Sequence, residues 1–165
     1  MDLTFIFFVS SFFLVIFSCI GFGLFFIRFL NFNKNIICTG YCGLIGIFFL
    51  IIYSYISHYF YPHAYTHNLI LLILGLIFFF YFFKFNFSSN LLITIIVFSI
   101  ILVGFIIFKT HDDFPYYHFP YTYYLTQNPI ILGIGRLNHG FRTPSSIFYL
   151  NSLFYLPFVK YYLFH

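Results

Sequence analysis

Uncharged apolar segments alternate with short polar segments along the first two-thirds of the chain. The apolar segments cover residues 3–27, 36–57, 68–83 and 91–108. Each is close to the roughly 20 residues that a helix needs to cross the hydrocarbon core of a bilayer. The pattern therefore predicts an all-α, polytopic membrane protein with four transmembrane helices within residues 1–108.

The polarity changes after the fourth apolar segment. Residues 109–143 hold two of the three carboxylates and three of the seven histidines of the chain. Such a segment behind several spans is where a membrane protein performs chemistry or binds a polar ligand. We expect a long extracytoplasmic loop there, carrying the candidate site.

Residues 144–165 follow as a further element. Thr143 and Pro144 have the pattern of a helix start, with Thr as N-cap and Pro at the first helical position. Apolar residues then surround a polar side that includes Tyr149 and Ser152. The segment predicts an interfacial helix, or a fifth membrane helix kinked at Pro157.

The amino-acid composition indicates that the protein lies in a membrane, and it limits the partners that the protein could bind. The chain is 62% hydrophobic and only 6% charged, with a mean hydropathy of +1.00, whereas about a quarter of the residues of a soluble domain are charged. The lipid bilayer is therefore the first partner that we expect. The net charge of +4 comes from Lys and Arg residues spread along the chain. Without a polybasic run, nucleic acid is not an expected partner.

The positive charges between the spans predict an orientation. Arg28 and Lys34 lie between the first two spans and Lys84 lies between the third and fourth, whereas the connection between the second and third has no Lys or Arg. The positive-inside rule places the charged connections in the cytoplasm. Residues 109–143 then lie on the outer side of the membrane.

Asp112 and Asp113 are the first candidates for chemistry. The chain has no Glu and its other carboxylate is Asp2, so a carboxylate base or hard-metal ligand must come from this pair. Together with His111 and His118 they could hold a divalent cation such as Mg²⁺ or Mn²⁺, or Zn²⁺. The alternative is a solvated helix end and turn, for which Asp and Pro are ordinary residues.

A second candidate segment is spaced by glycines and basic. Arg136, His139 and Arg142 lie among Gly133, Gly135 and Gly140. Side chains of this kind, with backbone amides freed by glycine, suit a phosphate or a carboxylate. The alternative is a flexible loop whose arginines contact lipid headgroups.

Two other clusters favour structural interpretations. Cys38 and Cys42 share a helix face and suit close packing, because two thiols give too few ligands for a zinc site. His58, His63 and His67 lie among tyrosines after the second span. Here we expect the tyrosines to anchor the segment at the membrane interface and the histidines to be solvated. This interpretation is preferred to a metal site. His63 and His67, four residues apart, could share a helix face.

Two strings carry a resemblance to known proteins. The segments HDDFPYYH at 111–118 and NHGFRTPSS at 138–146 resemble the N-terminal part of a family of uncharacterised bacterial polytopic membrane proteins. That family is similar to the C-type membrane glycosyltransferases, which use lipid-phosphate sugar donors. The resemblance implies an essential acidic residue at Asp112 or Asp113 and a polyprenyl-phosphate sugar as ligand. It also implies location in the bacterial inner (cytoplasmic) membrane, and further transmembrane helices in a longer chain.

Two functions therefore remain open. In the first, the chain is the N-terminal portion of a glycosyltransferase-like protein that acts on a lipid-linked sugar at the outer membrane–water interface. Asp112 or Asp113 would serve as base or metal ligand, and Arg136, His139 and Arg142 would bind the donor phosphate. The alternative is a non-catalytic membrane subunit or transport component whose loop docks a partner. Transport is the weaker version, because the four spans contain no Asp, Glu, Lys, Arg or His.

Overall fold

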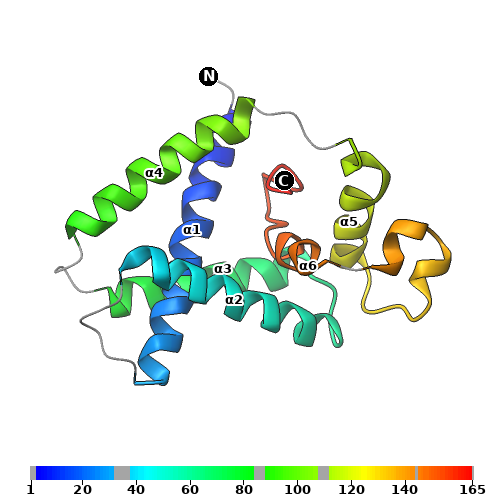
Figure 1. Ribbon diagram of the computed structural model, residues 1–165, viewed down its shortest axis with the longest axis horizontal. Helices are drawn as coiled ribbons and strands as arrows, with labels where there is room; N and C mark the ends of the chain where they lie inside the picture. The colour runs from blue at the N-terminus through cyan, green and yellow to red at the C-terminus, as the bar shows by residue number, and fades with distance from the viewer. Residues whose placement is uncertain (1–2, 32–37, 84–87, 108–111, 144, 165) are drawn as a thin grey trace. The chain divides into compact units, whose positions relative to one another are not determined.

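The computed structural model describes residues 3–31, 38–83, 88–107, 112–143 and 145–164. Within these ranges the regular structure is helical, apart from one isolated antiparallel bridge between Leu156 and Lys160. The α-helices are labelled in Figure 1, where the colour bar locates the shorter elements by residue number. The elements are α1 (Leu3–Phe29), α2 (Thr39–His58), α3 (Tyr65–Phe82), α4 (Ser88–Ile107), η3 (Phe114–His118), α5 (Phe119–Gln127), η4 (Ile134–Arg136), η5 (His139–Arg142) and α6 (Ser146–Ser152).

The expectation of an all-helical chain with long apolar helices is confirmed. By length and composition α1, α2 and α3 could each cross a membrane, whereas the apolar part of α4 is shorter, Leu91–Ile107. Three of the four predicted spans thus correspond to helices of sufficient length and hydropathy, and the fourth span stays a prediction. The expected orientation depends partly on Lys34 and Lys84, which lie outside the described residues.

The segment expected to be a long loop is mostly helical. It contains the π-helix η3, in which Phe119 N donates to Phe114 O, then α5 and two short 3-10 helices. Pro115 and Pro120 lie in the first turns of η3 and α5, where the missing N–H has no helical partner to lose. The described part of residues 109–143 is therefore a built element with its own buried side chains.

Within the described residues 145–164 there is no fifth spanning helix. α6 has seven residues, about 10 Å of helix, which is a third of a hydrocarbon core. Pro157 and the positive φ angles of Phe158 (70°) and Lys160 (48°) accompany the turns that follow it. The N-cap is Ser145, whose Oγ accepts from Ile147 N, and not Thr143; Pro144 lies outside the described residues. The interfacial placement of α6 stays a prediction.

The contacts divide the chain into two compact units, which do not follow the division expected at residues 108 and 143. We call residues 9–50 and 71–108 the apolar unit, and residues 1–8, 51–70 and 109–165 the polar unit. α2 and α3 each contribute one end to the polar unit. The end of the second span and the start of the third therefore belong structurally with the predicted site.

The apolar unit packs through small residues that let backbones approach. A Cβ built on Gly46 would collide with Cys19 O and lie 2.9 Å from Gly23 N, and one on Gly75 would collide with Ser18 Oγ. Close approach of this kind is the usual source of helix association in lipid. Cys42 is buried in the core of this unit, as the packing interpretation predicts, whereas Cys38 is exposed; both are free thiols.

Candidate functional site

His63 lies at the centre of the polar unit, in the link between α2 and α3, and is 0% exposed. Its Nδ1 lies 2.6 Å from Ser152 Oγ and its Nε2 lies 3.0 Å from Ser57 Oγ. Ser152 Oγ donates to Tyr149 O at 2.7 Å, so it accepts from Nδ1–H. Ser57 Oγ lies 3.4 Å from Ser54 O and 3.0 Å from Nε2, and the shorter contact assigns its hydrogen to Nε2. The arrangement fits a neutral imidazole. Burial, with His58 and His67 nearby, lowers the pKa of His63 to about 3.

The neighbouring histidines are also held by hydrogen bonds. His67 Nδ1 donates to Asn68 Oδ1 at 2.9 Å, and its Nε2 accepts from Tyr53 OH at 2.9 Å. His58 Nε2 donates to Asn128 O at 3.0 Å, while its buried Nδ1 has no hydrogen-bond partner in the described chain. The expectation of solvated histidines is therefore wrong for His58, which is 2% exposed, and for His63. Their burial depends on α5 and α6, which follow much later in the chain.

His63 and His67 do not share a helix face, because His63 lies in the link before α3, although their rings are in contact. Their rings stack with centroids 5.2 Å apart, and the His58 ring meets His63 edge-on at 5.1 Å. Their ring nitrogens are engaged mainly with serine, asparagine, tyrosine and backbone oxygens. Among the residues that the structure describes, no group of three His, Cys, Asp or Glu side chains is arranged to hold a metal ion.

The side-chain amide of Asn68 connects α6 to the histidine site through hydrogen bonds. Its Nδ2 lies 2.8 Å from both His63 O and Ser152 O, and 3.0 Å from Tyr155 O. The side chain is 1% exposed, so these carbonyls cannot turn to water for a donor. α3, the α2–α3 link and the C-terminal end of α6 are thereby joined through one amide group.

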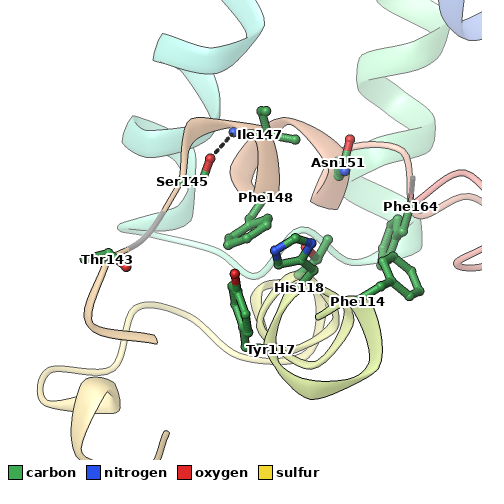
Figure 2. Close-up of a pocket in the computed structure, with 10 residues that line it drawn as sticks. Phe114, Tyr117, His118, Thr143, Ser145, Ile147, Phe148, Asn151 and Phe164 are labelled. Atoms are coloured by element: carbon green, nitrogen blue, oxygen red, sulfur yellow. Dashed lines mark hydrogen bonds between the residues drawn. The ribbon is translucent and has the colours of Figure 1, made fainter. Parts of the chain in front are cut away.

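A pocket of about 300 Å³ lies beside α6, within the polar unit. Figure 2 shows Tyr117 and His118 of η3 facing Phe148 of α6 across it. The ring centroids of His118 and Phe148 are 5.0 Å apart. The lining consists of aromatic rings and uncharged polar groups with one histidine and one aliphatic side chain: Phe114, Tyr117, His118, Thr122, Thr143, Ser145, Ile147, Phe148, Asn151 and Phe164.

The two predicted acidic residues, Asp112 and Asp113, differ in their position relative to this pocket. Tyr117 OH donates to Asp113 Oδ2 at 3.4 Å, which places the Asp113 carboxylate next to a side chain of the pocket lining. Asp112 is exposed in the preceding turn. His118 lines the pocket, whereas His111 lies outside the described residues, so the proposed cation site of Asp112, Asp113, His111 and His118 stays a prediction.

Arg136, His139 and Arg142 come together on η4 and η5 but do not belong to the pocket lining. All three are exposed, and Arg142 Nε donates to Gly135 O at 3.2 Å. Gly133, with φ at +85°, starts the η4 turn in a conformation that favours glycine. The phosphate role of these three residues stays a prediction for a ligand that extends beyond the pocket.

The connection between η5 and η3 is direct. Asn138 Oδ1 accepts from Gly140 N at 2.9 Å, and its Nδ2 donates to Tyr116 O at 3.1 Å. A Cβ on Gly140 would lie 2.5 Å from Tyr117 Cγ, so this glycine is needed for the backbone to pass the pocket tyrosine. The two segments of the resemblance therefore meet at Tyr117.

Several site residues were not among the sequence candidates, notably Asn68, Thr122, Asn151 and Ser152. Polar side chains within apolar helices were the available signal, since such groups are buried only when they are hydrogen-bonded. No protein-family model, curated protein or solved structure matches this chain. The function must therefore be argued from the pocket and the residues around it.

Proposed function

We propose that this chain is part of a glycosyltransferase-like membrane protein and that its pocket receives the sugar ring of a lipid-linked sugar. The observation that carries the proposal is the pocket lining beside Asp113. Phe114, Phe148 and Phe164 offer apolar ring surfaces, and a set of hydroxyl and amide groups lies between them. Flat apolar faces with a few convergent polar groups are what a sugar ring requires.

The charge of the lining indicates which part of the ligand enters. The pocket residues include no Lys, Arg, Asp or Glu, and the lining contains one histidine, His118. A phosphate prefers bidentate arginine partners. The neutral ring therefore suits the pocket. The phosphate would lie outside it, within reach of the exposed Arg136 and Arg142, while the hydrocarbon chain of the lipid would stay in the bilayer.

The reaction assigns a role to Asp113. The hydroxyl of the acceptor attacks the anomeric carbon, the bond from that carbon to the phosphate oxygen breaks, and the hydroxyl proton passes to the carboxylate. The phosphate leaves with the electron pair of the broken bond. Arg136 and Arg142 would stabilise its charge. Tyr117, bonded to Asp113, would orient the carboxylate relative to the bound ring.

One observation favours the docking function as a second candidate. Leu132 is 89% exposed and Leu137 is 73% exposed, and both lie beside Arg136 in the segment around η4. Exposed apolar side chains flanked by basic groups suit contact with another protein. In that case the pocket would have no saccharide ligand.

The test compares two adjacent tyrosines. The purified chain in lipid nanodiscs is titrated with a polyprenyl-phosphate sugar and, separately, with the same polyprenyl phosphate lacking sugar. We expect the sugar-bearing lipid to bind more tightly. Tyr117→Phe should weaken that preference by about 2–10-fold, the value of one hydrogen bond. Tyr116→Phe is the control, because Tyr116 is 72% exposed and does not belong to the pocket lining.

Two results would reject the proposal. Equal binding of the two lipids would show that the sugar does not occupy the pocket, and it would favour the docking function. Equal effects of Tyr117→Phe and Tyr116→Phe would show that the sugar binds elsewhere. We do not expect turnover by residues 1–165 alone, because a complete donor pocket requires walls from further helices.

A further inference from the structure

α6 takes part in both sites of the polar unit. Phe148 and Asn151 line the pocket. Ser152 follows Phe148 by about one helical turn and is bonded through Oγ to His63 and through its carbonyl to Asn68. The pocket and the site of the buried histidine thus share one short helix.

A helix of seven residues cannot hold its own position. Its partners outside the histidine site are mainly aromatic: Tyr149 stacks on Tyr55 with centroids 4.1 Å apart, and Tyr155, just after α6, stacks on Tyr65 at 4.2 Å. The polar contacts with His63 and Asn68 fix the rotation and height of α6 along these rings, since hydrogen bonds are directional and ring stacking is much less so.

We infer that His63 is a positioning residue for the pocket: its neutral ring holds α6, and acidification releases α6 and the pocket wall. The link to saccharide binding rests on the proposed function, whereas the release of α6 does not.

The surroundings of His63 determine the direction of the effect. The titratable groups that face it are His58 from α2 and His67 from α3; α5 contributes Leu125 O, which accepts from His63 N at 3.0 Å, and α6 contributes Ser152. Neither histidine would stabilise an added positive charge on His63. The serines could still accept hydrogen bonds from a protonated ring, so the opposition to protonation comes from burial and from the other two histidines.

The sign follows from linkage. His63 has a pKa of about 3 when α6 is docked and about 6.5 when it is exposed. Stability from docking is therefore complete above about pH 6.5 and is lost as the pH falls toward 3. Within that window each pH unit favours the released form by up to about tenfold.

The experiment measures amide hydrogen exchange of the full chain in nanodiscs, as protection factors, between pH 7.5 and pH 5. In the wild-type protein we expect the protection of the α6 amides, including Leu153 N bonded to Leu150 O, to fall by about 10–30-fold. The amides of α4 should keep their protection. Unchanged α6 protection across this range in the wild-type protein would overturn the inference without need of any variant.

Two variants sharpen the result. His63→Gln keeps hydrogen-bonding capacity but cannot titrate, so the pH response of α6 should disappear. Ser152→Ala should lower α6 protection at pH 7.5 by about 3–10-fold, the effect of one hydrogen bond. Ser99→Ala is the matched control, since Ser99 Oγ also bonds a carbonyl of its own helix, Ile95 O, but lies in the apolar unit. A pH response retained in a folded His63→Gln protein would assign the switch to another group.

The saccharide titration separates the two proposals. If α6 protection depends on pH but no sugar-bearing lipid binds at any pH, the proposed function fails and the positioning role of His63 stands. If the sugar-bearing lipid binds equally at pH 7.5 and pH 5 while α6 protection stays constant, the inference fails and the proposed function stands.

Discussion

The two units of this protein bury different chemistry. Of the ten buried polar side chains in the described residues, only Ser18 and Thr39 belong to the apolar unit, and the other eight belong to the polar unit. The apolar unit is held by close backbone contact at Gly46 and Gly75. The polar unit is held by hydrogen bonds that converge on His63 and Asn68.

The difference reflects what each unit must do. Close packing of small residues stabilises helices where no water competes and no ligand enters. A binding site must instead fix particular side chains, and a satisfied network of buried hydrogen bonds specifies one arrangement. The polar unit therefore resembles the interior of a soluble domain more than it resembles a bundle of spans.

The largest effect is expected from a substitution in the polar unit, at the proposed catalytic residue. Asp113→Asn keeps the volume of the side chain but removes its charge, so activity of the complete protein should fall by about 10²–10⁴-fold. Asp112→Asn is the companion, because Asp112 is exposed and farther along the turn from Tyr117. The measurement is restoration of cell-envelope glycan in a strain that lacks the native protein. Full restoration by both variants would contradict catalysis at this segment.

Asn68→Ala should give the largest loss of stability. Three carbonyl oxygens lose the side-chain donor that they share, and of these Ser152 O keeps a long hydrogen bond of 3.4 Å from Tyr155 N. The loss of donors to buried carbonyls should destabilise the fold by about 2–4 kcal/mol in total. The free energy of unfolding in mixed micelles measures the loss. Asn128→Ala is the control, since Asn128 provides its backbone oxygen to His58, and it should change stability by less than about 0.5 kcal/mol.

Gly46→Ala tests the apolar unit in the same assay. The new Cβ would collide with Cys19 O, a backbone atom that cannot move aside, and we expect a loss of about 2–3 kcal/mol. Gly43→Ala lies on the same helix, but its Cβ would meet Ile20 Cγ1 at an ordinary 3.7 Å. That control should be neutral or slightly stabilising, because alanine favours a helix. Similar losses from the two variants would argue against close packing at Gly46.

The smallest effect is expected from the hydrogen bond between Thr39 Oγ1 and Thr94 Oγ1, 2.7 Å long, in the apolar unit. A double-mutant cycle of Thr39→Val and Thr94→Val should give a coupling energy of about 0.6 kcal/mol, as is usual for such bonds in membrane proteins. A coupling above about 2 kcal/mol would make the contrast between the two units much weaker than we describe.

Some of this architecture could be predicted from the sequence because it is local. The length of an apolar segment sets the length of a spanning helix, so the bounds expected for α1 and α4 differ from those observed by three residues or fewer. Glycine and proline also acted locally, at Gly133 and Pro115. Each of these features depends on neighbouring residues alone.

The errors concern contacts between distant residues. His63 and Ser152 are 89 positions apart, and the periodicity of either segment gives no sign of the other. His63 was therefore expected to be solvated, and residues 144–165 were expected to form an interfacial helix or a fifth span. The pocket was missed for the same reason, since Thr122 and Asn151 become a site only when α5 and α6 pack together.

The π-helix η3 has a consequence for how this site tolerates change in length. Its bond from Phe119 N to Phe114 O encloses one more residue than an α-helical turn does. Deleting one residue within 114–118 would turn this segment into a regular α-helical turn, which covers nearly the same rotation with one residue fewer, so the preceding chain would keep its orientation relative to α5. Asp113 precedes this turn and Thr122 follows it. A single-codon deletion in η3 would therefore leave the carboxylate near the pocket, whereas the same deletion within α5 would rotate the chain by about 100° and separate the two.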